Sequence, residues 1–528
     1  MSLTTSQPVS DQPTFRNAIA EGADPWVVYH EAHYYWTFAA AGRGVYVFRS
    51  DRLTSLGERH LAWQAPASGP NSQEVWAPEL HRIEGQWYIY TTASDGDNAT
   101  HRVVVLESTT GEPLGPYRFK AQLYTGDHYA TGEVNRWAID ATPLEHHGRR
   151  YIVWSGWDAD ADDQWLYIAP LANAWTTAGN RVRLCPHDDY GWERVGGTPM
   201  GRGLNEAPQI LKRDGRTFIV FSACGSWEPI YKLGLLELVG ENPLSPVAWR
   251  KFPEPVFRAT EDTWGAGHAC FTRSPDSTED WMVYHAKETH ERDWKRSVFV
   301  QPFRFVDGLP DFGRPVARGV ALPVPSGQRT VAQPRSDYVS DFARGWGEWD
   351  YYGHQDLIGV QNGRLYLGDF NDHLAMFRSG EKLLLRDRGW GEFNVAASIM
   401  LEDDEALLGF LIGAGAPNLG FGQQEGVFVG IEVGAVVVFR WQDGVRTELL
   451  RQAERVEKGT DYELVLQVTR DAIAMTSPWQ FKLTDPAMAA LRGMVGILLE
   501  RGRGIVEELA VTALPDRIAT SGSVTHNL

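Results

Sequence analysis

QWYIYTTA, at residues 86–93, is the stretch of sequence that decides the fold, because the N-terminal part of the chain contains five versions of it. The other four versions are HYYWTFAA (33–40), RRYIVWSG (149–156), RTFIVFSA (216–223) and EDWMVYHA (279–286). Each version is rich in aromatic and β-branched residues, which is typical of a short β-strand. Their starts lie about 50 to 67 residues apart, which is the period of a propeller blade. The repeat therefore predicts a five-bladed β-propeller.

An ionisable side chain precedes each of these strands by about 7 to 11 residues. The five residues are Asp24, Glu79, Asp140, Glu206 and His268. A propeller directs the start of every innermost strand at one central axis, so these side chains should converge. Like charges that are crowded together away from water repel one another, and such a cluster is rarely structural. The repeat therefore predicts a functional pocket on the axis.

Composition limits the class of protein and of ligand. The chain has 528 residues, which is too many for one core, and it is 43% hydrophobic and 22% charged, as in ordinary globular proteins. It contains no run of about 18 apolar residues, so we expect no membrane-spanning helix. The net charge of −18 argues against nucleic acid, anionic membranes and polyanionic substrates as partners. A neutral ligand suits this charge better.

The cysteines and the N-terminus indicate the compartment. Cys185, Cys224 and Cys270 are too few for a disulfide framework and lack the spacing of a metal site. The first residues, MSLTTSQPVSDQPTFRNAIAEG, have neither a basic segment nor an apolar core of the kind found in a signal peptide. The sequence therefore predicts a cytoplasmic protein, unless a signal peptide has already been removed.

Changes in pattern along the chain predict two domains. We expect a disordered leader at 1–19, the propeller at 20–325, a linker at 326–339, a second β domain at 340–515 and a frayed tail at 516–528. The second domain lacks the repeat but alternates apolar and polar residues, as in DYELVLQVT (461–469), which predicts a jelly-roll-like β-sandwich. The segment TDPAMAALRG (484–493) predicts one short helix within it.

Three of the acidic residues have a context that favours catalysis. Asp24 lies in GADPWVVYH, Asp140 in WAIDATPLEH and Glu206 in GLNEAPQIL, each at the entry to an apolar strand. Taken singly, an Asp before a Pro is also a common turn residue. Together, one carboxylate could activate a water, a second carboxyl could keep its proton as an acid, and a third could tune that proton. This is the set of groups that cleaves a glycosidic bond.

Residues 20–310 resemble glycoside hydrolase family 43, in its arabinofuranosidase-like branch. The matching stretches are ADPWVVYH, WAPELHRIEGQWYIYTTAS, AIDATPLEHHGRRYIVWSGW, NEAPQILKRDGRTFIVFSACGSW and GAGHACFTRSPDSTEDWMVYHA. The resemblance implies that Asp24 is the general base, that Glu206 is the general acid, and that Asp140 tunes the acid and orients the substrate. It also implies inversion of the anomeric configuration, for which the acid and the base stand roughly 6.5–9.5 Å apart.

The same resemblance assigns roles to two basic residues. It implies that His268 lies beside a metal ion on the propeller axis, commonly calcium, although a lone buried histidine is more often an ordinary core residue. Calcium prefers oxygen ligands, so one imidazole completed by waters would be a weak site. The resemblance also implies that Arg296, in DWKRSVFVQPF, contacts substrate hydroxyls near the acids. The alternative for Arg296 is a surface position.

The remaining candidates for substrate binding are one acid and three tryptophans. Glu79, in WAPEL, either lines the sugar pocket or holds a neighbouring strand. Trp76, Trp157 and Trp26 could each stack on a sugar ring, but Trp in a strand is more often part of the core. We expect one of the three to stack on substrate.

The forms GADPW, NEAPQ and FSACGSW are more similar to the arabinofuranosidase branch than to the xylosidases. Ala141 and Ala207, which are small residues next to the catalytic acids, fit a tight furanose pocket. We expect release of terminal α-L-arabinofuranosyl units from arabinan or arabino-oligosaccharides. The alternatives are a β-xylosidase or an endo-arabinanase on the same scaffold and, from another class, a glycan-binding propeller without catalysis.

The C-terminal region resembles the concanavalin-like β-sandwich modules of sugar-processing enzymes. The stretch RDRGWGEFNVAASIML (386–401) carries this likeness. The module could bind glycan, close one side of the active site, or serve only for packing or dimerisation.

Overall fold

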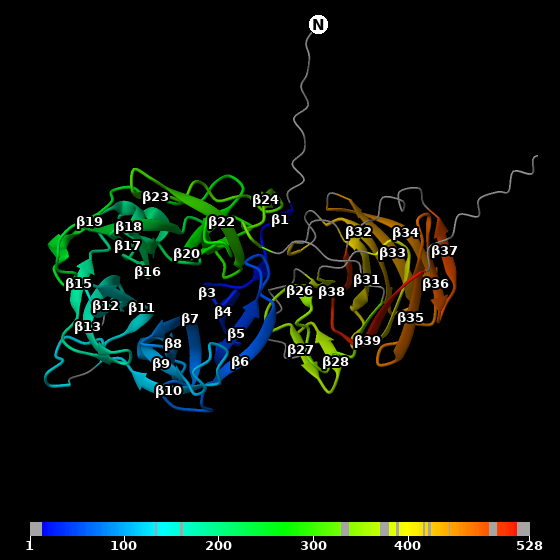
Figure 1. Ribbon diagram of the computed structural model, residues 1–528, viewed down its shortest axis with the longest axis horizontal. Coiled ribbons are helices and arrows are strands. Elements are labelled where there is room, and N and C mark those ends of the chain that lie inside the picture. The colour runs from blue at the N-terminus through cyan, green and yellow to red at the C-terminus, as the bar shows by residue number, and fades with distance from the viewer. Residues whose placement is uncertain are drawn as a thin grey trace, which may run out of the picture.

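The computed structural model describes residues 13–132, 135–158, 162–328, 337–369, 380–386, 390–414, 418–420, 424–442, 444–484 and 494–514. These residues form two all-β domains that lie side by side, a ring of blades and a sandwich of two sheets (Figure 1). The prediction of a five-bladed propeller followed by a β-sandwich is confirmed.

The described part of the propeller folds into five antiparallel blades. Blade 1 contains β3 (Trp26–His30), β4 (His33–Ala39), β5 (Gly44–Ser50) and β6 (Glu58–Gln64). Blade 2 contains β7 (Gln73–Ile83), β8 (Gln86–Ser94), β9 (Arg102–Ser108) and β10 (Tyr117–Gln122). Blade 3 contains β11 (Ala138–His146), β12 (Arg149–Trp157) and β13 (Gln164–Asn173), with β14 (Thr176–Thr177) and β15 (Val182–Cys185) both paired to β13.

Blade 4 contains β16 (Asn205–Arg213), β17 (Arg216–Ala223), β18 (Lys232–Leu238) and β19 (Trp249–Lys251). Blade 5 contains β20 (Trp264–Arg273), β21 (Asp280–Lys287), β22 (Ser297–Val306) and β23 (Leu309–Asp311), together with β2 (Ala20–Glu21). The five repeated segments are the second strands, β4, β8, β12, β17 and β21. The first strands, β3, β7, β11, β16 and β20, contact one another in a closed ring around the axis.

The N-terminal segment closes this ring, because β2 pairs with β22 as the last strand of blade 5. The side chain of Asn17 also donates to the Val300 carbonyl at 2.8 Å and accepts from the Val300 amide at 2.9 Å. The expected leader at 1–19 is therefore too long. Thr14–Arg16 form β1, which pairs with β24 (Ala321–Pro323), and the rest of the expected leader, 1–12, lies outside the described residues. The segment is ordered because β2 pairs with the start of β22, whereas β23 pairs only with the end of that strand.

The second domain consists of two stacked sheets. One sheet contains β25 (Asp337–Ser340), β27 (Ile358–Gln361), β28 (Arg364–Leu367), β30 (Phe393–Leu401), β35 (Asp461–Val468), β36 (Ala472–Ser477), β37 (Phe481–Thr484) and β39 (Gly504–Ala513). The other contains β26 (Trp349–Tyr352), β29 (Glu381–Leu385), β31 (Leu407–Ala414), β32 (Gly426–Glu432), β33 (Ala435–Gln442), β34 (Val445–Ala453) and β38 (Met494–Arg501).

Two of the expected boundaries of this domain need comment. The domain begins at β25, a few residues before the expected start at 340, because this strand pairs with β39. Of the expected linker, Gln328 is bound to blade 1 through the Leu53 amide and the Thr54 hydroxyl, and 329–336 lie outside the described residues. The expected helix at 484–493, after its first residue, and the tail at 516–528 also lie outside them.

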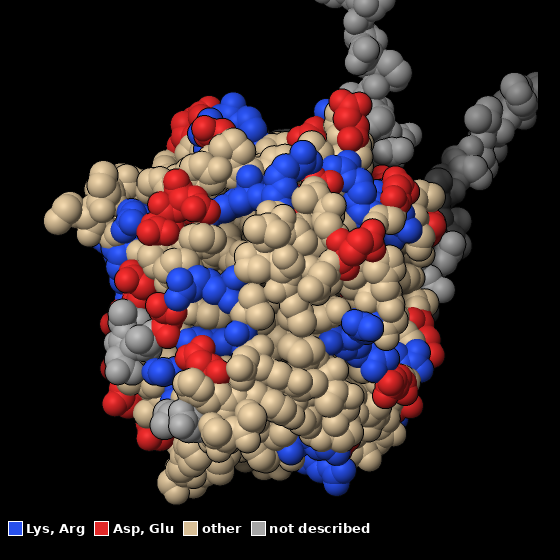
Figure 2. All heavy atoms as spheres, turned by 90° about the vertical axis from the view of Figure 1, so that its left-hand side faces the viewer, with Lys and Arg blue, Asp and Glu red and all other residues tan. Residues whose placement is uncertain are grey.

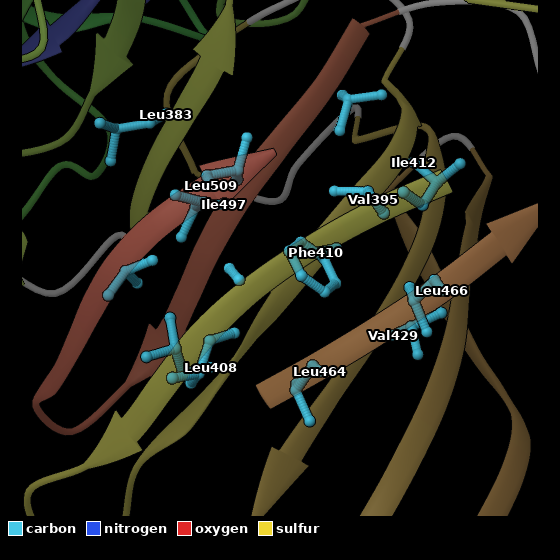
Figure 3. Close-up of a cluster of buried hydrophobic side chains, with 14 of the residues drawn as sticks. Leu383, Val395, Leu408, Phe410, Ile412, Val429, Leu464, Leu466, Ile497 and Leu509 are labelled. Carbon is cyan, nitrogen blue, oxygen red and sulfur yellow. The ribbon is translucent and has the colours of Figure 1, made fainter. Parts of the chain in front are cut away.

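Alternation of residues along the strands builds the core of the sandwich. Leu464 and Leu466 of β35 are buried, whereas Glu463 and Gln467, which flank this pair, are exposed, as the sequence predicts. Figure 3 shows Leu464 and Leu466 on one strand and Phe410 on a strand of the facing sheet, and all three belong to the same buried cluster. Burial of these apolar side chains between the sheets stabilises the domain.

The sandwich packs directly against the propeller. One apolar cluster contains Phe218 and Tyr284 of blades 4 and 5 together with Phe428 of the sandwich. Arg386 of the sandwich lies 3.0 Å from the carboxylate of Asp51 in blade 1. A shared apolar core and an ion pair therefore join the two domains.

Figure 2 shows the propeller face that lies on the left in Figure 1, where acidic and basic side chains are interspersed. Within blade 4, for example, Arg216 and Arg250 both pair with Glu237. Cys185, Cys224 and Cys270 are buried and free. Among the described residues, no helix is both long and apolar enough to cross a membrane.

Candidate active site

An irregularity in the first strand of each blade aims side chains at the axis. Asp24, Ala77, Asp140, Ala207 and His268 all have a positive φ, between 42° and 54°, although none is glycine. The last four lie where the strand register shifts, in β7, β11, β16 and β20. A β-bulge bends a strand and redirects its side chains, and backbone strain of this kind is concentrated at functional sites.

The bulges surround one cavity of about 690 Å³ on the axis. Its wall contains the three predicted catalytic acids together with Trp76, His268 and Arg296. The remaining lining residues are Asn98, Trp137, Ile139, Asp162, Gln164, Arg202, Ser226, Trp227, Arg292, Asp293 and Trp294. All of them belong to the propeller, so none of the described residues of the sandwich forms part of this wall. The described residues of the sandwich therefore do not close one side of the active site, which was one of the roles expected for this module.

Asp24 is held by positive charge and hydrogen bonds. Its Oδ1 lies 3.1 Å from His268 Nδ1 and 3.4 Å from Arg296 Nη1, and its backbone amide donates to His285 Nδ1 at 3.1 Å. Burial acts to raise the pKa of Asp24, but the charges of His268 and Arg296 and the hydrogen bond from His268 outweigh it. The pKa of Asp24 is held well below its usual value. Asp24 is therefore a carboxylate at any pH near neutrality.

The two histidines beside Asp24 differ in charge. Burial lowers the pKa of His268, but the Asp24 charge and hydrogen bond and the charges of Asp140 and Glu206 raise it to about 9. Burial dominates at His285 and lowers its pKa to about 3. His268 is consequently a cation at neutral pH, and His285 is a neutral ring.

The pKa values of Asp140 and Glu206 are shifted in the opposite direction to that of Asp24. Burial raises the pKa of Asp140 to about 7, with further contributions from the charges of Glu206 and Asp24, although His268 acts to lower it. Burial also raises the pKa of Glu206, against a hydrogen bond from Tyr231. Two such neighbours titrate as a pair. The pair retains a proton near neutral pH, in the same cavity as an ionised Asp24.

Direct hydrogen bonds fix the two members of this pair. The amide of Ala207 donates to Asp140 Oδ2 at 2.9 Å, which ties Asp140 to the residue that follows Glu206. The hydroxyl of Tyr231 donates to Glu206 Oε1 at 2.8 Å. Neighbouring blades therefore hold the two carboxyl groups in register.

Glu79 lies outside the cavity wall, so the expectation that it binds substrate is not supported. Its Oε2 is 2.8 Å from His81 Nε2, and its Oε1 accepts a hydrogen bond from Gln209. The reason is the distance from the repeat strand. The bulge residue lies nine residues before that strand in four blades, at Asp24, Ala77, Asp140 and Ala207. Ala77 rather than Glu79 therefore occupies the bulge of blade 2. Glu79 instead joins β7 of blade 2 to β16 of blade 4 through Gln209, which is a structural role like the alternative.

The three candidate tryptophans also differ in whether they line the cavity. Trp76 lines the cavity and stacks on His101, with ring centroids 3.9 Å apart. Trp157 lies behind Trp137, stacked at 4.8 Å with an interplanar angle of 10°, so Trp137 is the ring that faces the cavity. Trp26 donates to the Leu80 carbonyl at 2.9 Å and is not part of the wall. Of the three candidates, only Trp76 is placed to meet a sugar.

Several site residues were missed from the sequence. His285 is the last polar residue of the fifth repeat strand, and this position could have drawn attention to it. Tyr231, Trp227 and Trp294 follow no repeat and lie in connections between strands, where the sequence pattern carries no signal.

Asp24, His268 and His285 form a buried group that could hold a metal ion, with ligand atoms within 4.8 Å of one another. The group does not fit calcium. Two of its three donors are imidazole nitrogens, whereas calcium takes six to eight oxygens. The Asp24 carboxylate is already paired with His268, which carries a proton at neutral pH. The predicted axial calcium therefore has no oxygen-rich set among these three residues.

A propeller whose axial cavity holds one ionised carboxylate and a protonated carboxyl pair is the framework of a glycosidase. Residues 15–310 match the model of glycosyl hydrolases family 43, and the chain belongs to this family.

Two relatives of this chain are named as arabinofuranosidases. The chain is 34% identical over 283 residues to the extracellular exo-alpha-(1->5)-L-arabinofuranosidase of Streptomyces chartreusis, which covers 52% of this chain and 82% of that protein. It is 34% identical over 335 residues to alpha-L-arabinofuranosidase 43 of Humicola insolens, which covers 60% of this chain and 66% of that protein.

Two solved structures have a similar fold. The alpha-L-arabinofuranosidase of Lactobacillus brevis has a TM-score of 0.53 and 29% identity, covering 58% of this chain and 98% of that one. A family 43 protein of Bacillus licheniformis covers 95% of this chain and 100% of its own, with a TM-score of 0.51 and 14% identity. The second likeness extends over both domains and concerns the fold alone.

Proposed function

We propose that this glycoside hydrolase releases terminal α-L-arabinofuranosyl units from arabinan or arabino-oligosaccharides with inversion of configuration. The observation that carries the proposal is the convergence of Asp24, Asp140 and Glu206 on one cavity, where the pKa of Asp24 is lowered and those of Asp140 and Glu206 are raised. Asp24 is ionised, while Asp140 and Glu206 retain a proton. An inverting glycosidase needs a carboxylate and a carboxylic acid at the same time.

The geometry supports a role for each acid. Asp24 takes a proton from a water molecule, whose oxygen attacks the anomeric carbon. Glu206 gives its proton to the glycosidic oxygen as the carbon–oxygen bond breaks, and it ends as a carboxylate. Asp140, bound by the Ala207 amide, lies beside Glu206 and its charge opposes loss of that proton. The carboxyl separation of roughly 6.5–9.5 Å expected for inversion stays a prediction.

The choice of sugar rests on similarity and on charge. Two relatives and one solved structure with appreciable identity are named as arabinofuranosidases. The cavity wall combines tryptophans with hydrogen-bonding groups, which suits a neutral sugar. A glycan-binding propeller without catalysis would not need three buried carboxyl groups, whose mutual repulsion costs stability.

A panel of nitrophenyl glycosides followed by a digest of linear arabinan tests the proposal. We expect hydrolysis of the α-L-arabinofuranoside and release of single arabinose units, with the β anomer appearing first by NMR. Xylose from a xyloside would support the xylosidase alternative, and internal fragments would support the endo-arabinanase. Glycan binding without hydrolysis of any substrate would overturn the assignment of an enzyme.

Removal of the Asp140 charge should change the pH profile in a defined direction. The acid form of Glu206 is needed, so kcat/KM falls as pH rises through the pKa of the Asp140–Glu206 pair. In Asp140→Asn the negative charge that raises the pKa of its neighbour is absent. We expect the alkaline limb to move to lower pH and kcat at neutral pH to fall about 10- to 100-fold.

Asp280→Asn is the matched control for this variant. Asp280 is an ion-paired carboxylate of blade 5, bound to Arg213 and Arg273, and it does not line the cavity. Its substitution should leave the limb in place. A limb that moves to higher pH in Asp140→Asn, or that does not move, would contradict the role of Asp140.

A further inference from the structure

We propose that Tyr231 is a positioning residue that fixes the orientation of Glu206 for proton transfer and joins the Glu206 and Asp24 sites through His285. The proposal rests on the glycosidase reaction proposed above, but not on the identity of the sugar.

The first observation is the hydrogen bond to Glu206. Tyr231 lies immediately before β18, is fully buried, and donates to Glu206 Oε1 at 2.8 Å. Glu206 itself is a buried residue on the cavity wall. Because Oε1 accepts the hydrogen bond from the Tyr231 hydroxyl, the transferable proton of Glu206 belongs on Oε2. The single bond thus selects which carboxyl oxygen gives its proton to the substrate.

The second observation is the packing of the Tyr231 ring. The ring stacks on His285 with centroids 5.5 Å apart and an interplanar angle of 15°. On another side lies Gly267, where a Cβ atom would overlap the ring carbons of Tyr231. Gly267 directly precedes His268 in the bulge of β20. Only a glycine at this point of the bulge leaves room for the ring in its present position.

His285 connects this ring to the base. Its Nδ1 accepts the backbone amide of Asp24 at 3.1 Å, and its ring is fully buried. Tyr231, His285 and the Asp24 backbone therefore form one packed unit between the acid and the base. A shift of the Tyr231 ring would therefore disturb both the acid, Glu206, and the base, Asp24.

The hydrogen bond has a chemical consequence during the reaction. Glu206 starts as a neutral acid and ends as a carboxylate, and a hydrogen bond to a charged acceptor is stronger than one to a neutral acceptor. The bond from Tyr231 therefore strengthens as the proton leaves Oε2. Burial and the nearby carboxyl groups hold the pKa of Tyr231 well above its usual value, so Tyr231 keeps its own proton and serves only as a donor.

The test compares Tyr231→Phe with wild type on two substrates that share a sugar but differ in leaving group. On a disaccharide, whose leaving group needs protonation, we expect kcat to fall about tenfold with KM nearly unchanged. On the nitrophenyl glycoside, whose leaving group departs without help, we expect a change below about twofold. Loss of a donor to the carboxylate should also move the alkaline limb of kcat/KM to higher pH, opposite to Asp140→Asn.

The groups that act on the Glu206 charge from the surrounding elements stay in place in this variant. They are Asp24, Asp140, Arg202, His268 and Arg296. The matched control is Tyr34→Phe, which removes a buried hydroxyl that donates to the Arg273 carbonyl at 2.7 Å, outside the cavity. This control variant should leave the kcat on both substrates and the alkaline limb of kcat/KM unchanged.

A second variant tests the packing without touching the hydroxyl. Gly267→Ala should displace the Tyr231 ring and, because that ring packs on His285 beside Asp24, slow the reaction on both substrates, with the larger loss on the disaccharide. Equal losses on both substrates in Tyr231→Phe, or an unmoved limb, would overturn the proposal. If the wild type prefers a xyloside, the proposed sugar falls, and the same comparison on xylobiose and nitrophenyl xyloside still decides the role of Tyr231.

Discussion

Glu206→Gln should hydrolyse arabino-oligosaccharides about 10²- to 10⁴-fold more slowly than the wild type, a loss of about 3 to 5 kcal/mol of transition-state stabilisation. Glutamine preserves the shape of the side chain and can still accept the hydrogen bond from Tyr231. It has no proton to give to the glycosidic oxygen. The measurement is kcat for a purified arabino-oligosaccharide at the pH optimum of the wild type, together with a thermal melt that checks folding.

The loss should depend on the leaving group and on pH. A nitrophenolate leaves without protonation, so the rate on a nitrophenyl glycoside should fall much less. The alkaline limb of the profile should disappear, because the group that must keep its proton is gone. These two signatures distinguish loss of an acid from general damage to the site.

Glu79→Gln is the matched control for Glu206→Gln. Glu79 is also a buried acid on a first strand, but it is bound to His81 and Gln209 outside the cavity wall. We expect a lower melting temperature and a turnover within about threefold of the wild type, because only buried hydrogen bonds outside the cavity are weakened. A near-normal rate in Glu206→Gln, or a loss of the same size in Glu79→Gln, would contradict the assigned acid.

The propeller could be predicted because its repeat lies in the sequence itself. Five similar strands at a blade-like period leave few arrangements other than a ring. Closure of the ring was not predicted, because β2 pairs with a strand almost 280 residues away and has only two residues to show a pattern. Pairing at that sequence distance leaves no local periodicity to read.

The catalytic acids could be predicted because the bulge position is fixed relative to the repeat. Asp24 and Asp140 lie at the nine-residue offset, and Glu206 lies one residue earlier, before Ala207. Glu79 misled the prediction because residue type was weighed above this offset. Tyr231 and Trp294 could not be predicted, because connections between strands bring Trp294 to the cavity and Tyr231 to Glu206, and these positions depend on the folded ring.

Asp24→Asn should reduce turnover about 10³- to 10⁴-fold on every glycoside, activated or not, because attack by water needs the base whatever the leaving group. The fold should survive. Asn tolerates the positive φ of 53° at this position, and its backbone amide can still donate to His285. Loss of the carboxylate should also lower the pKa of His268 from about 9, because the Asp24 charge is a main cause of that raised value.

Sodium azide separates loss of the base from loss of the site in this variant. Azide is an anion that attacks carbon without giving up a proton, so it replaces water and base together. In Asp24→Asn we expect azide to restore turnover on a nitrophenyl arabinofuranoside and to give the glycosyl azide of inverted configuration, as read by NMR. Azide should not rescue Glu206→Gln on an oligosaccharide, because the leaving oxygen there still lacks its proton. A product of retained configuration would mean that a protein side chain attacks the sugar first, and the inverting assignment of Asp24 would then be wrong.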